Sequence, residues 1–152
     1  MENIQTRIPN RLDAMAGVVS IVEAFGKEHG LSHRIVNDVN VALDEVLNNI
    51  ISYAFEPGAR SEIGIRLEII GGKIVIDIDD AGRPFDPLGA PPPDLTGGLR
   101  ERRVGGLGIH FVRNLMDAVE YTRVGERNRL RLSKTLASDE REEPGGEWHG
   151  NR

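Results

Sequence analysis

The chain has 152 residues, an apolar fraction of 39%, a formal net charge of −5 at pH 7 and no cysteine. This length suits one domain with a single hydrophobic core. The negative charge argues against direct, general electrostatic binding to nucleic acid, and the lack of cysteine excludes a disulfide framework, a thiolate zinc site and a cysteine nucleophile.

The first thirty residues predict a strand followed by a helix. Residues 2–8 alternate loosely between polar and apolar side chains. Asn10 is a candidate N-cap, apolar residues then recur at helical spacing as far as Phe25, and Gly30 ends the helix. The start of the chain has no apolar signal-peptide region, and no apolar run approaches the roughly 20 residues that span a bilayer. We therefore expect a cytoplasmic protein with no membrane contact.

A second helix is predicted between Ser32, which can cap it, and the Pro-Gly pair at 57–58, which ends it. Its expected apolar face consists of Ile35, Val39, Ala42, Leu43, Val46, Ile50 and Ala54. The stretch VNVALDEVLNNIISYAF interrupts this apolar helix with two carboxylates and two carboxamides within six residues.

Helical geometry divides these polar groups into two sets. At 100° per residue, Glu45, Asn49 and Tyr53 each step about 40° and form a row along the edge of the apolar face. Asp44 and Asn48 point further toward solvent. Carboxylate and carboxamide oxygens suit Mg²⁺, and a carboxylate beside it could orient or deprotonate a hydroxyl. A polar row that only flanks the core has the same pattern, so both interpretations stay open.

Two alternating strands follow, EIGIRLEII and KIVIDIDD, joined by a glycine pair at 71–72 that predicts a hairpin turn. The second strand ends in Asp79 and Asp80, and Gly82 follows. A carboxylate at a strand end can accept a hydrogen bond from an exocyclic amine, and a neighbouring glycine lets a flat ring approach the backbone. Asp and Gly are equally typical of a plain turn.

Residues 81–106 are rich in Gly and Pro, and a loop of this length is usually functional or disordered. Its run RERR at 100–103 could bring a cation to a phosphate or could be a solvated loop. The loop ends in Gly105, Gly106 and Gly108, directly before a predicted helix. Free amides at a helix N-terminus favour phosphate, whereas a flexible hinge would have the same composition.

The segments AVEYTRV and NRLRLSKTL predict two final strands joined at Gly125. The charged, Gly-rich tail at 137–152 is expected to be disordered. The element order predicts an α+β fold over residues 1–136, a two-layer α/β sandwich whose mostly antiparallel, mixed sheet is covered on one face by helices.

The order and spacing of the motifs resemble the ATP-binding domain shared by histidine kinases, gyrase, Hsp90 and MutL, the GHKL or Bergerat fold. Glu45, Asn49 and Tyr53 match the N-box of that family. Asp80 and Gly82 match its Asp-x-Gly box. The resemblance implies that Asn49 ligates Mg²⁺ at the phosphates of ATP, and that Glu45 is the general base or positions the attacking hydroxyl. It also implies that Asp80 accepts a hydrogen bond from the adenine amino group and that Gly82 lines the adenine pocket.

The glycine-rich segment resembles the last box of the same family. Gly106-Leu107-Gly108, preceded by Gly105, would then bind the phosphates of ATP. The loop from about 86 to 104 would be the ATP lid.

The small size, the single short lid and the segments GLGIHFVRNLMDAVEY and NRLRLSK resemble the anti-sigma-factor serine kinases of bacterial partner-switching systems. This implies a homodimeric serine/threonine kinase that uses ATP and Mg²⁺, phosphorylates a STAS-domain antagonist and sequesters a sigma factor. The alternative is a nucleotide-gated binding module without useful kinase activity that regulates a non-sigma target, but the retained Glu45 favours the kinase. A small ATPase or the catalytic part of a two-component kinase is less favoured, since we see no phospho-acceptor helix pair.

Overall fold

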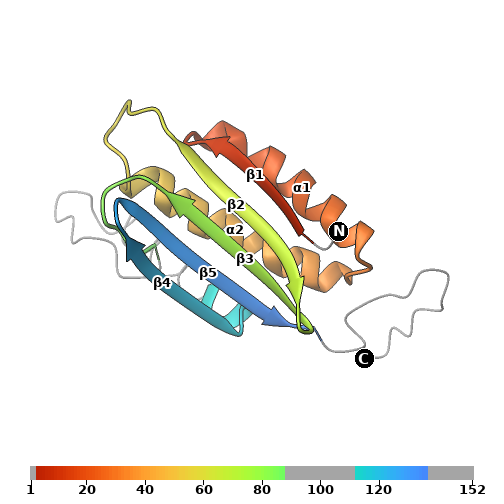
Figure 1. Cartoon of the computed structure of the whole chain (residues 1–152). Coiled ribbons are helices and arrows are strands. Elements are labelled where there is room, and N and C mark those ends of the chain that lie inside the picture. Colours follow the sequence, from red (N-terminus) through yellow and green to blue (C-terminus); the bar gives the residue numbers. More distant parts are fainter. Residues whose placement is uncertain (1–2, 88–111, 137–152) are drawn as a thin grey trace.

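Five strands form one sheet in the order β1-β2-β3-β5-β4 (Figure 1). They are seen in a computed structural model that describes residues 3–87 and 112–136. The strands are β1 (Asn3–Pro9), β2 (Glu62–Ile70), β3 (Lys73–Asp80), β4 (Ala118–Val124) and β5 (Arg127–Thr135). All four neighbouring pairs are antiparallel, so the described strands form an antiparallel sheet without the parallel pair that a mixed sheet would need.

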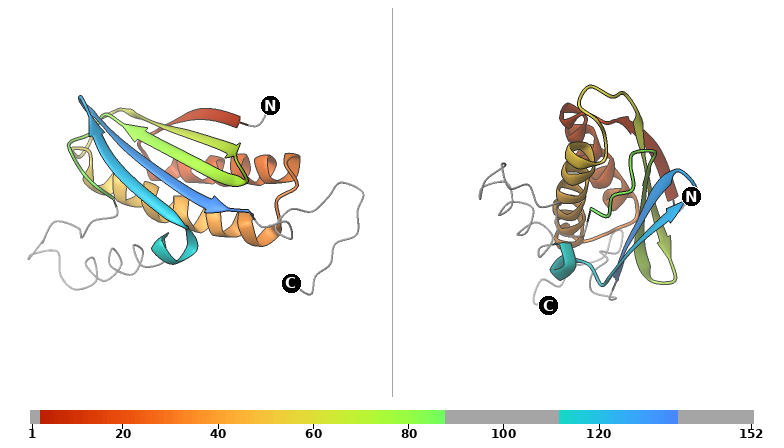
Figure 2. Two further views of the ribbon diagram at one scale, coloured as in Figure 1. Left: turned by 60° about the horizontal axis from the view of Figure 1, so that its bottom comes forward. Right: turned by 90° about the vertical axis from the view of Figure 1, so that its left-hand side faces the viewer.

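Two helices, α1 (Met15–Glu28) and α2 (His33–Tyr53), lie side by side against one face of the sheet (Figure 2). A short 3-10 helix, η1 (Leu12–Ala14), precedes α1. The predicted α+β two-layer sandwich is thereby confirmed. No helix within the described ranges has the length and apolar character needed to cross a membrane.

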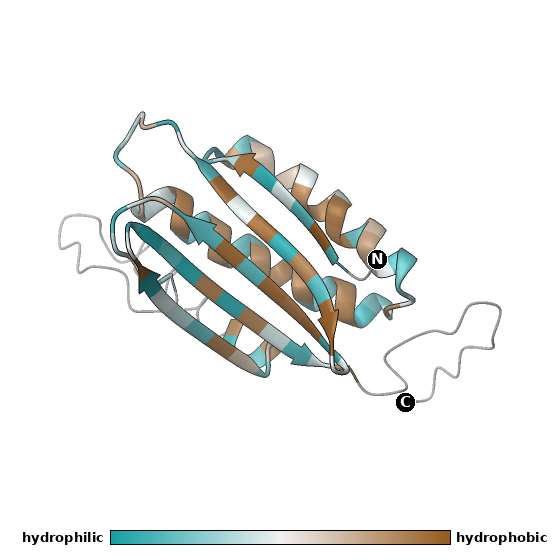
Figure 3. Ribbon diagram, in the orientation of Figure 1, coloured by the Kyte–Doolittle hydropathy of each residue, from teal (hydrophilic) through white to brown (hydrophobic). Residues whose placement is uncertain are grey.

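The core lies between the helices and the sheet because strand residues alternate between the two faces (Figure 3). Burial of each Leu or Ile side chain contributes about 1.5–3 kcal/mol. Every residue of the apolar face predicted for α2 is buried. The largest fully buried side chains include Ile35, Leu43, Leu47 and Ile50 of α2, and Ile63, Leu67, Ile74, Ile76, Ile78 and Leu132 of the sheet.

The ends of α2 agree with the sequence prediction. Ser32 is the N-cap, and its side chain accepts a hydrogen bond from the Ile35 amide at 3.2 Å. The helix ends at Tyr53, with Ala54 as C-cap, shortly before the Pro-Gly pair. The capping hydrogen bond satisfies one of the free amides of the first turn.

The N-cap predicted for the first helix is wrong. Helix α1 begins at Met15 after Ala14, which makes no side-chain cap. Asn10 instead ties the end of β1 to the loop before β2. Its Nδ2 donates to the Ala59 carbonyl at 3.0 Å, and its Oδ1 accepts from the Ser61 amide at 3.1 Å. Because these partners are distant in the chain, a local capping rule could not reveal them.

The turns between strands use glycine where the backbone is left-handed. Gly71 and Gly72 have φ angles of 55° and 76°, which confirms the predicted turn between β2 and β3. Gly125, between β4 and β5, has a φ angle of 59°. Residues that carry a side chain rarely adopt this backbone conformation, so glycine is favoured at these positions.

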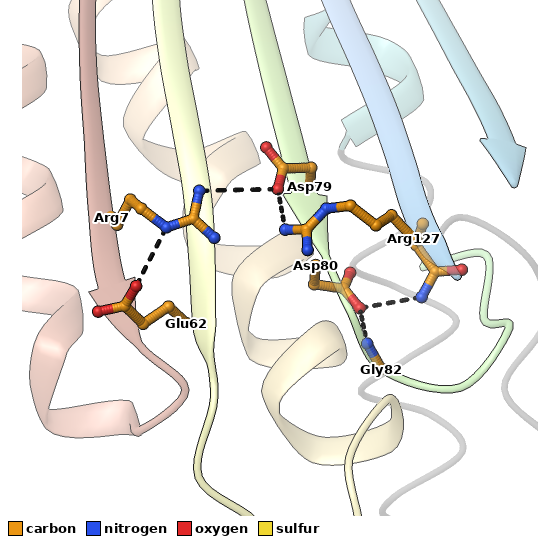
Figure 4. Close-up of polar contacts among 7 residues, drawn as sticks. Arg7, Glu62, Asp79, Asp80, Gly82 and Arg127 are labelled. Atoms are coloured by element: carbon orange, nitrogen blue, oxygen red, sulfur yellow. Dashed lines mark hydrogen bonds and ion pairs between the residues drawn. The ribbon is translucent and has the colours of Figure 1, made fainter. Parts of the chain in front are cut away.

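The helix-free face carries a row of ion pairs across four strands, which we call the ladder (Figure 4). Arg7 on β1 pairs with Glu62 at 3.1 Å and lies 3.9 Å from Asp79 on β3. Asp79 also pairs with Arg127 on β5. Arg7 reaches across β2 because Gly64 has no side chain. A Cβ there would lie 2.6 Å from Asp79 Oδ2 and 2.9 Å from Arg7 Nη1.

Candidate functional site

The Asp-x-Gly segment lies directly against the C-terminal end of α2. The Arg83 amide donates to the Ala54 carbonyl at 2.8 Å. A Cβ on Gly82 would lie 2.4 Å from that same carbonyl oxygen, which leaves no room for a side chain. The rings of Tyr53 and Phe85 also meet, with centroids 5.7 Å apart. Two motifs separated along the chain thus form one site.

Replacing Gly82 by Ala is expected to lower the free energy of unfolding by about 1–3 kcal/mol, because the new methyl group must displace backbone atoms. Urea denaturation would measure this change. Gly17 is the matched control, since nothing lies within 4 Å of a Cβ added there. Gly17→Ala should be neutral or stabilising by up to about 1 kcal/mol inside α1. A Gly82→Ala variant as stable as wild type would contradict the close approach.

The row on α2 faces the segment that follows β3. Asn49 is buried, with 8% exposure, and its Nδ2 donates to the Pro87 carbonyl at 3.2 Å. Glu45 and Tyr53 are half-buried, between core and solvent, as predicted. Within residues 3–87 and 112–136, Asn49 makes this hydrogen bond through Nδ2 and none is seen at its Oδ1.

The flank of the row differs from its prediction at one position. Asp44 is exposed, as expected, but Asn48 is half-buried. Helix α2 packs against α1 as well as the sheet, so its buried arc is wider than predicted and includes Leu47, which is fully buried.

The pKa of Glu45 is shifted by its surroundings. Burial raises the pKa of its carboxyl above the ordinary value, and repulsion from Asp44 raises it further. A carboxylate whose pKa moves toward neutrality is a better general base near pH 7.

Asp80 ends β3 and presents a carboxylate on the helix-covered side of the sheet, with 2% exposure. Its Oδ1 accepts from the Gly82 amide at 2.8 Å (Figure 4). The same oxygen accepts from Asn128 Nδ2 at 2.9 Å, whereas Oδ2 accepts from no described residue. Burial raises the pKa of the Asp80 carboxyl, and the two hydrogen bonds oppose that rise. The oxygen left over suits an amino group of a ligand.

Asn128 belongs to this site, although the sequence did not single it out. It lies on β5 directly opposite Asp80 and is 3% exposed. Besides Asp80, its Nδ2 donates to the Arg83 carbonyl at 2.7 Å. The only indication in the sequence was a carboxamide beside the alternating arginines of NRLRLSK. Its proximity to Asp80 follows only from the register of β3 with β5.

The side-chain oxygen of Asn128, Oδ1, accepts three hydrogen bonds. It accepts from the Phe85 amide at 3.1 Å, from the Tyr121 hydroxyl at 2.6 Å and from Arg123 Nη1 at 3.2 Å. Arg123 Nη1 also donates to the Gly82 carbonyl at 2.8 Å. One buried carboxamide therefore joins β4, β5 and the segment after β3.

The helix that follows the glycine-rich segment is described only at 112–115. Lys134 Nζ donates to the Leu115 carbonyl at 2.7 Å and lies 3.7 Å from Asp38 Oδ2 on α2. The side chains of both Lys134 and Asp38 are only 13% exposed. The end of this helix is thus fixed to the sheet by Lys134, which also lies close to Asp38 of α2.

The phosphate end of the predicted site lies outside the described residues. This holds for Gly105, Gly106, Leu107 and Gly108, for the run at 100–103 and for nearly all of the predicted lid. Within residues 3–87 and 112–136, no group of three His, Cys, Asp or Glu side chains could hold a metal. A Mg²⁺ ion here would depend on a carboxamide, on phosphates and on water, all of which supply the oxygen ligands that Mg²⁺ prefers.

The comparisons with known proteins agree with this geometry. Residues 8–134 match the family described as histidine kinase-like ATPase domain. The serine/threonine-protein kinase BtrW of Bordetella bronchiseptica is 33% identical over 108 residues, which cover 71% of this chain and 76% of that protein. The serine-protein kinase RsbW of Listeria monocytogenes is 26% identical over 130 residues, covering 79% and 82%.

A solved structure supports the fold. The crystal structure of the RsbU and RsbW domains of a Mycobacterium tuberculosis protein superposes with a TM-score of 0.67 at 13% identity. The superposition covers 95% of this chain and 35% of that chain.

Proposed function

Because the chain belongs to the histidine kinase-like ATPase domain family, we propose that it is a protein serine/threonine kinase that binds ATP with Mg²⁺. The names of its relatives support this activity. The observation that carries the proposal is the meeting of the α2 row with the segment after β3, through Asn49 with Pro87 and Tyr53 with Phe85. These two contacts support a site that includes Asn49 and Tyr53 of α2 together with the segment that follows Asp80.

In this proposal the base of ATP lies at Asp80, whose Oδ2 accepts a hydrogen bond from the amino group, beside Gly82. Asn49 Oδ1 is suited to ligate Mg²⁺. The Asn49 Nδ2 already donates to the Pro87 carbonyl, and no described residue donates to the oxygen. Bound Mg²⁺ would neutralise charge on the phosphates. Glu45 accepts the proton of the attacking hydroxyl or orients it. Tyr53 borders the nucleotide site, and the amides of residues 105–108 bind the phosphates.

We propose as substrate a STAS-domain anti-sigma-factor antagonist, and as second partner a sigma factor that the protein sequesters, as a cytoplasmic homodimer. These partners follow from the resemblance to anti-sigma-factor kinases of partner-switching systems. The half-buried Glu45, with its raised pKa, favours this proposal over a nucleotide-gated binding module without useful kinase activity.

The test begins with capture of partners from the native host in ATP and in ADP. The captured STAS protein is then incubated with the purified chain, Mg²⁺ and γ-labelled ATP, and the phosphorylated residue is mapped. We expect label on one serine or threonine of the STAS protein. Nucleotide binding without transfer would support the binding module instead, and failure to bind ATP would refute both functions.

A further inference from the structure

Asn128 is placed to control how Asp80 presents its carboxylate. The two side chains come from adjacent strands at directly paired positions, and both are almost completely buried. The Asn128 amide and the Gly82 amide both bind the same oxygen, Oδ1 of Asp80. Rotation of the carboxylate would break both hydrogen bonds inside a buried site, where unpaired polar groups are costly.

We propose that Asn128 is a positioning and specificity-determining residue that makes Asp80 select purines with an exocyclic amino group at ring position 6. By holding Oδ1 from β5, Asn128 leaves Oδ2 as the one oxygen with which Asp80 contacts the base. An ionised carboxylate oxygen accepts hydrogen bonds and donates none. This inference rests on the proposed function, because it assumes that the base of ATP lies at Asp80.

The orientation of Asn128 is itself fixed by its surroundings. Phe85, Tyr121 and Arg123 all donate to its Oδ1, so the amide must face Asp80 and Arg83. A carboxamide flipped by 180° would point its amide at these three donors.

Charge supports the same arrangement. The hydrogen bond from Asn128 lowers the pKa of the Asp80 carboxyl against the effect of burial, and the positive charge of Arg127 acts in the same direction. Asp79 opposes them. Removal of the Asn128 amide would therefore favour the protonated form of Asp80.

The test compares two ligands in full-length wild type and variants, with folding checked by thermal unfolding. The ligands are ATP and purine riboside 5′-triphosphate, which keeps the ring, ribose and triphosphate but lacks the 6-amino group. Calorimetry at pH 7.5 with Mg²⁺ should show at least tenfold tighter binding of ATP by wild type, as expected for a hydrogen bond to a charged acceptor.

In Asn128→Asp, the oxygen that accepts from Phe85, Tyr121 and Arg123 remains. The amide that donates to Asp80 and to the Arg83 carbonyl is replaced by an oxygen. We expect the preference for ATP to fall to threefold or less, with affinity for the purine riboside triphosphate within threefold of wild type. Tyr121→Phe is the matched control, because it removes one bond to Asn128 without touching the contact with Asp80, and it should keep the preference.

The inference would be overturned if Asn128→Asp kept the preference for ATP, or if its affinity fell equally for both ligands. Asn128 would then have only a structural role. If Asn128→Asp does not fold, Asn128→Ser decides by the same ratio, since its shorter side chain cannot reach Asp80. If wild type binds neither ligand, the proposed function fails and this inference falls with it. If wild type binds ATP and the variants keep the same ratio of affinities for the two ligands, this inference is refuted while the proposed function stands.

Discussion

Replacing Asp80 by Asn is expected to weaken ATP binding at least tenfold while leaving the fold intact. The new carboxamide oxygen can still accept from the Gly82 amide and from Asn128, so the hydrogen bonds to Oδ1 survive. The position of Oδ2 becomes an amide, which would face the amino group of adenine donor to donor. Such a mismatch costs more than a missing contact, because both groups are removed from water. Calorimetric titration with ATP measures the loss.

The same variant should gain stability relative to wild type as the pH rises. Burial raises the pKa of Asp80 above its ordinary value of 3.8. Ionised Asp80 therefore lowers the stability of the folded protein, and this penalty is absent below the unfolded pKa and complete above the folded pKa. Asn cannot ionise, so the difference in unfolding free energy between variant and wild type should move in favour of Asp80→Asn from pH 4 to pH 7.

Urea denaturation at these two pH values provides the measurement. A variant that binds ATP like wild type would remove Asp80 from base recognition. A difference in stability that moves the other way would show that the hydrogen bonds to Asp80 outweigh its burial.

Replacing Glu45 by Gln is expected to keep ATP affinity within about threefold of wild type and to slow phosphoryl transfer at least about 100-fold. A positioned general base typically contributes 10²–10⁴-fold to a rate. Gln has nearly the same size and keeps an oxygen toward the site, but it cannot accept the proton. Single-turnover transfer from labelled ATP to the captured STAS protein separates this loss from a loss of binding. Transfer at the wild-type rate would exclude Glu45 as the base.

Asp44→Asn is the matched control for that experiment. Asp44 is the exposed neighbour and helps to raise the pKa of Glu45, so its neutralisation should lower that pKa. Since a base must be deprotonated to act, the rate falls as pH drops through the pKa of Glu45. The acid limb of the pH–rate profile should therefore shift to lower pH in Asp44→Asn, while the rate at its plateau remains.

The elements of the fold were predictable because their signals are local. The 3.6-residue period of α2, its Ser32 cap and the glycine turns each depend on residues within a few positions of one another. Asn10 shows where local rules stop. Its side chain bonds to residues 49 and 51 positions away, and no capping pattern contains that information.

The candidate site was predictable in part. The resemblance singled out Asp80 and Gly82. The structure brings Gly82 to the end of α2, and the Gly82 amide donates to Asp80. The sequence analysis expected glycine at position 82 so that a flat ring could approach. The structure adds a second cause, the close approach of the Ala54 carbonyl. Asn128 could not be predicted, because its value depends on a partner 48 residues away across a strand pair.

The ladder on the helix-free face has a consequence for strand register. Asp79 and Asp80 are consecutive carboxylates that face opposite sides of β3, so a slip of one residue would exchange their surroundings. Asp79 would then take the position of Asp80 in the candidate site, and the same type of side chain would stand there. Arg7 and Arg127 hold Asp79 from both sides, and the gap at Gly64 admits Arg7 in this alignment. The ladder thus favours the register in which Asp80, and not Asp79, lies on the helix-covered side of the sheet.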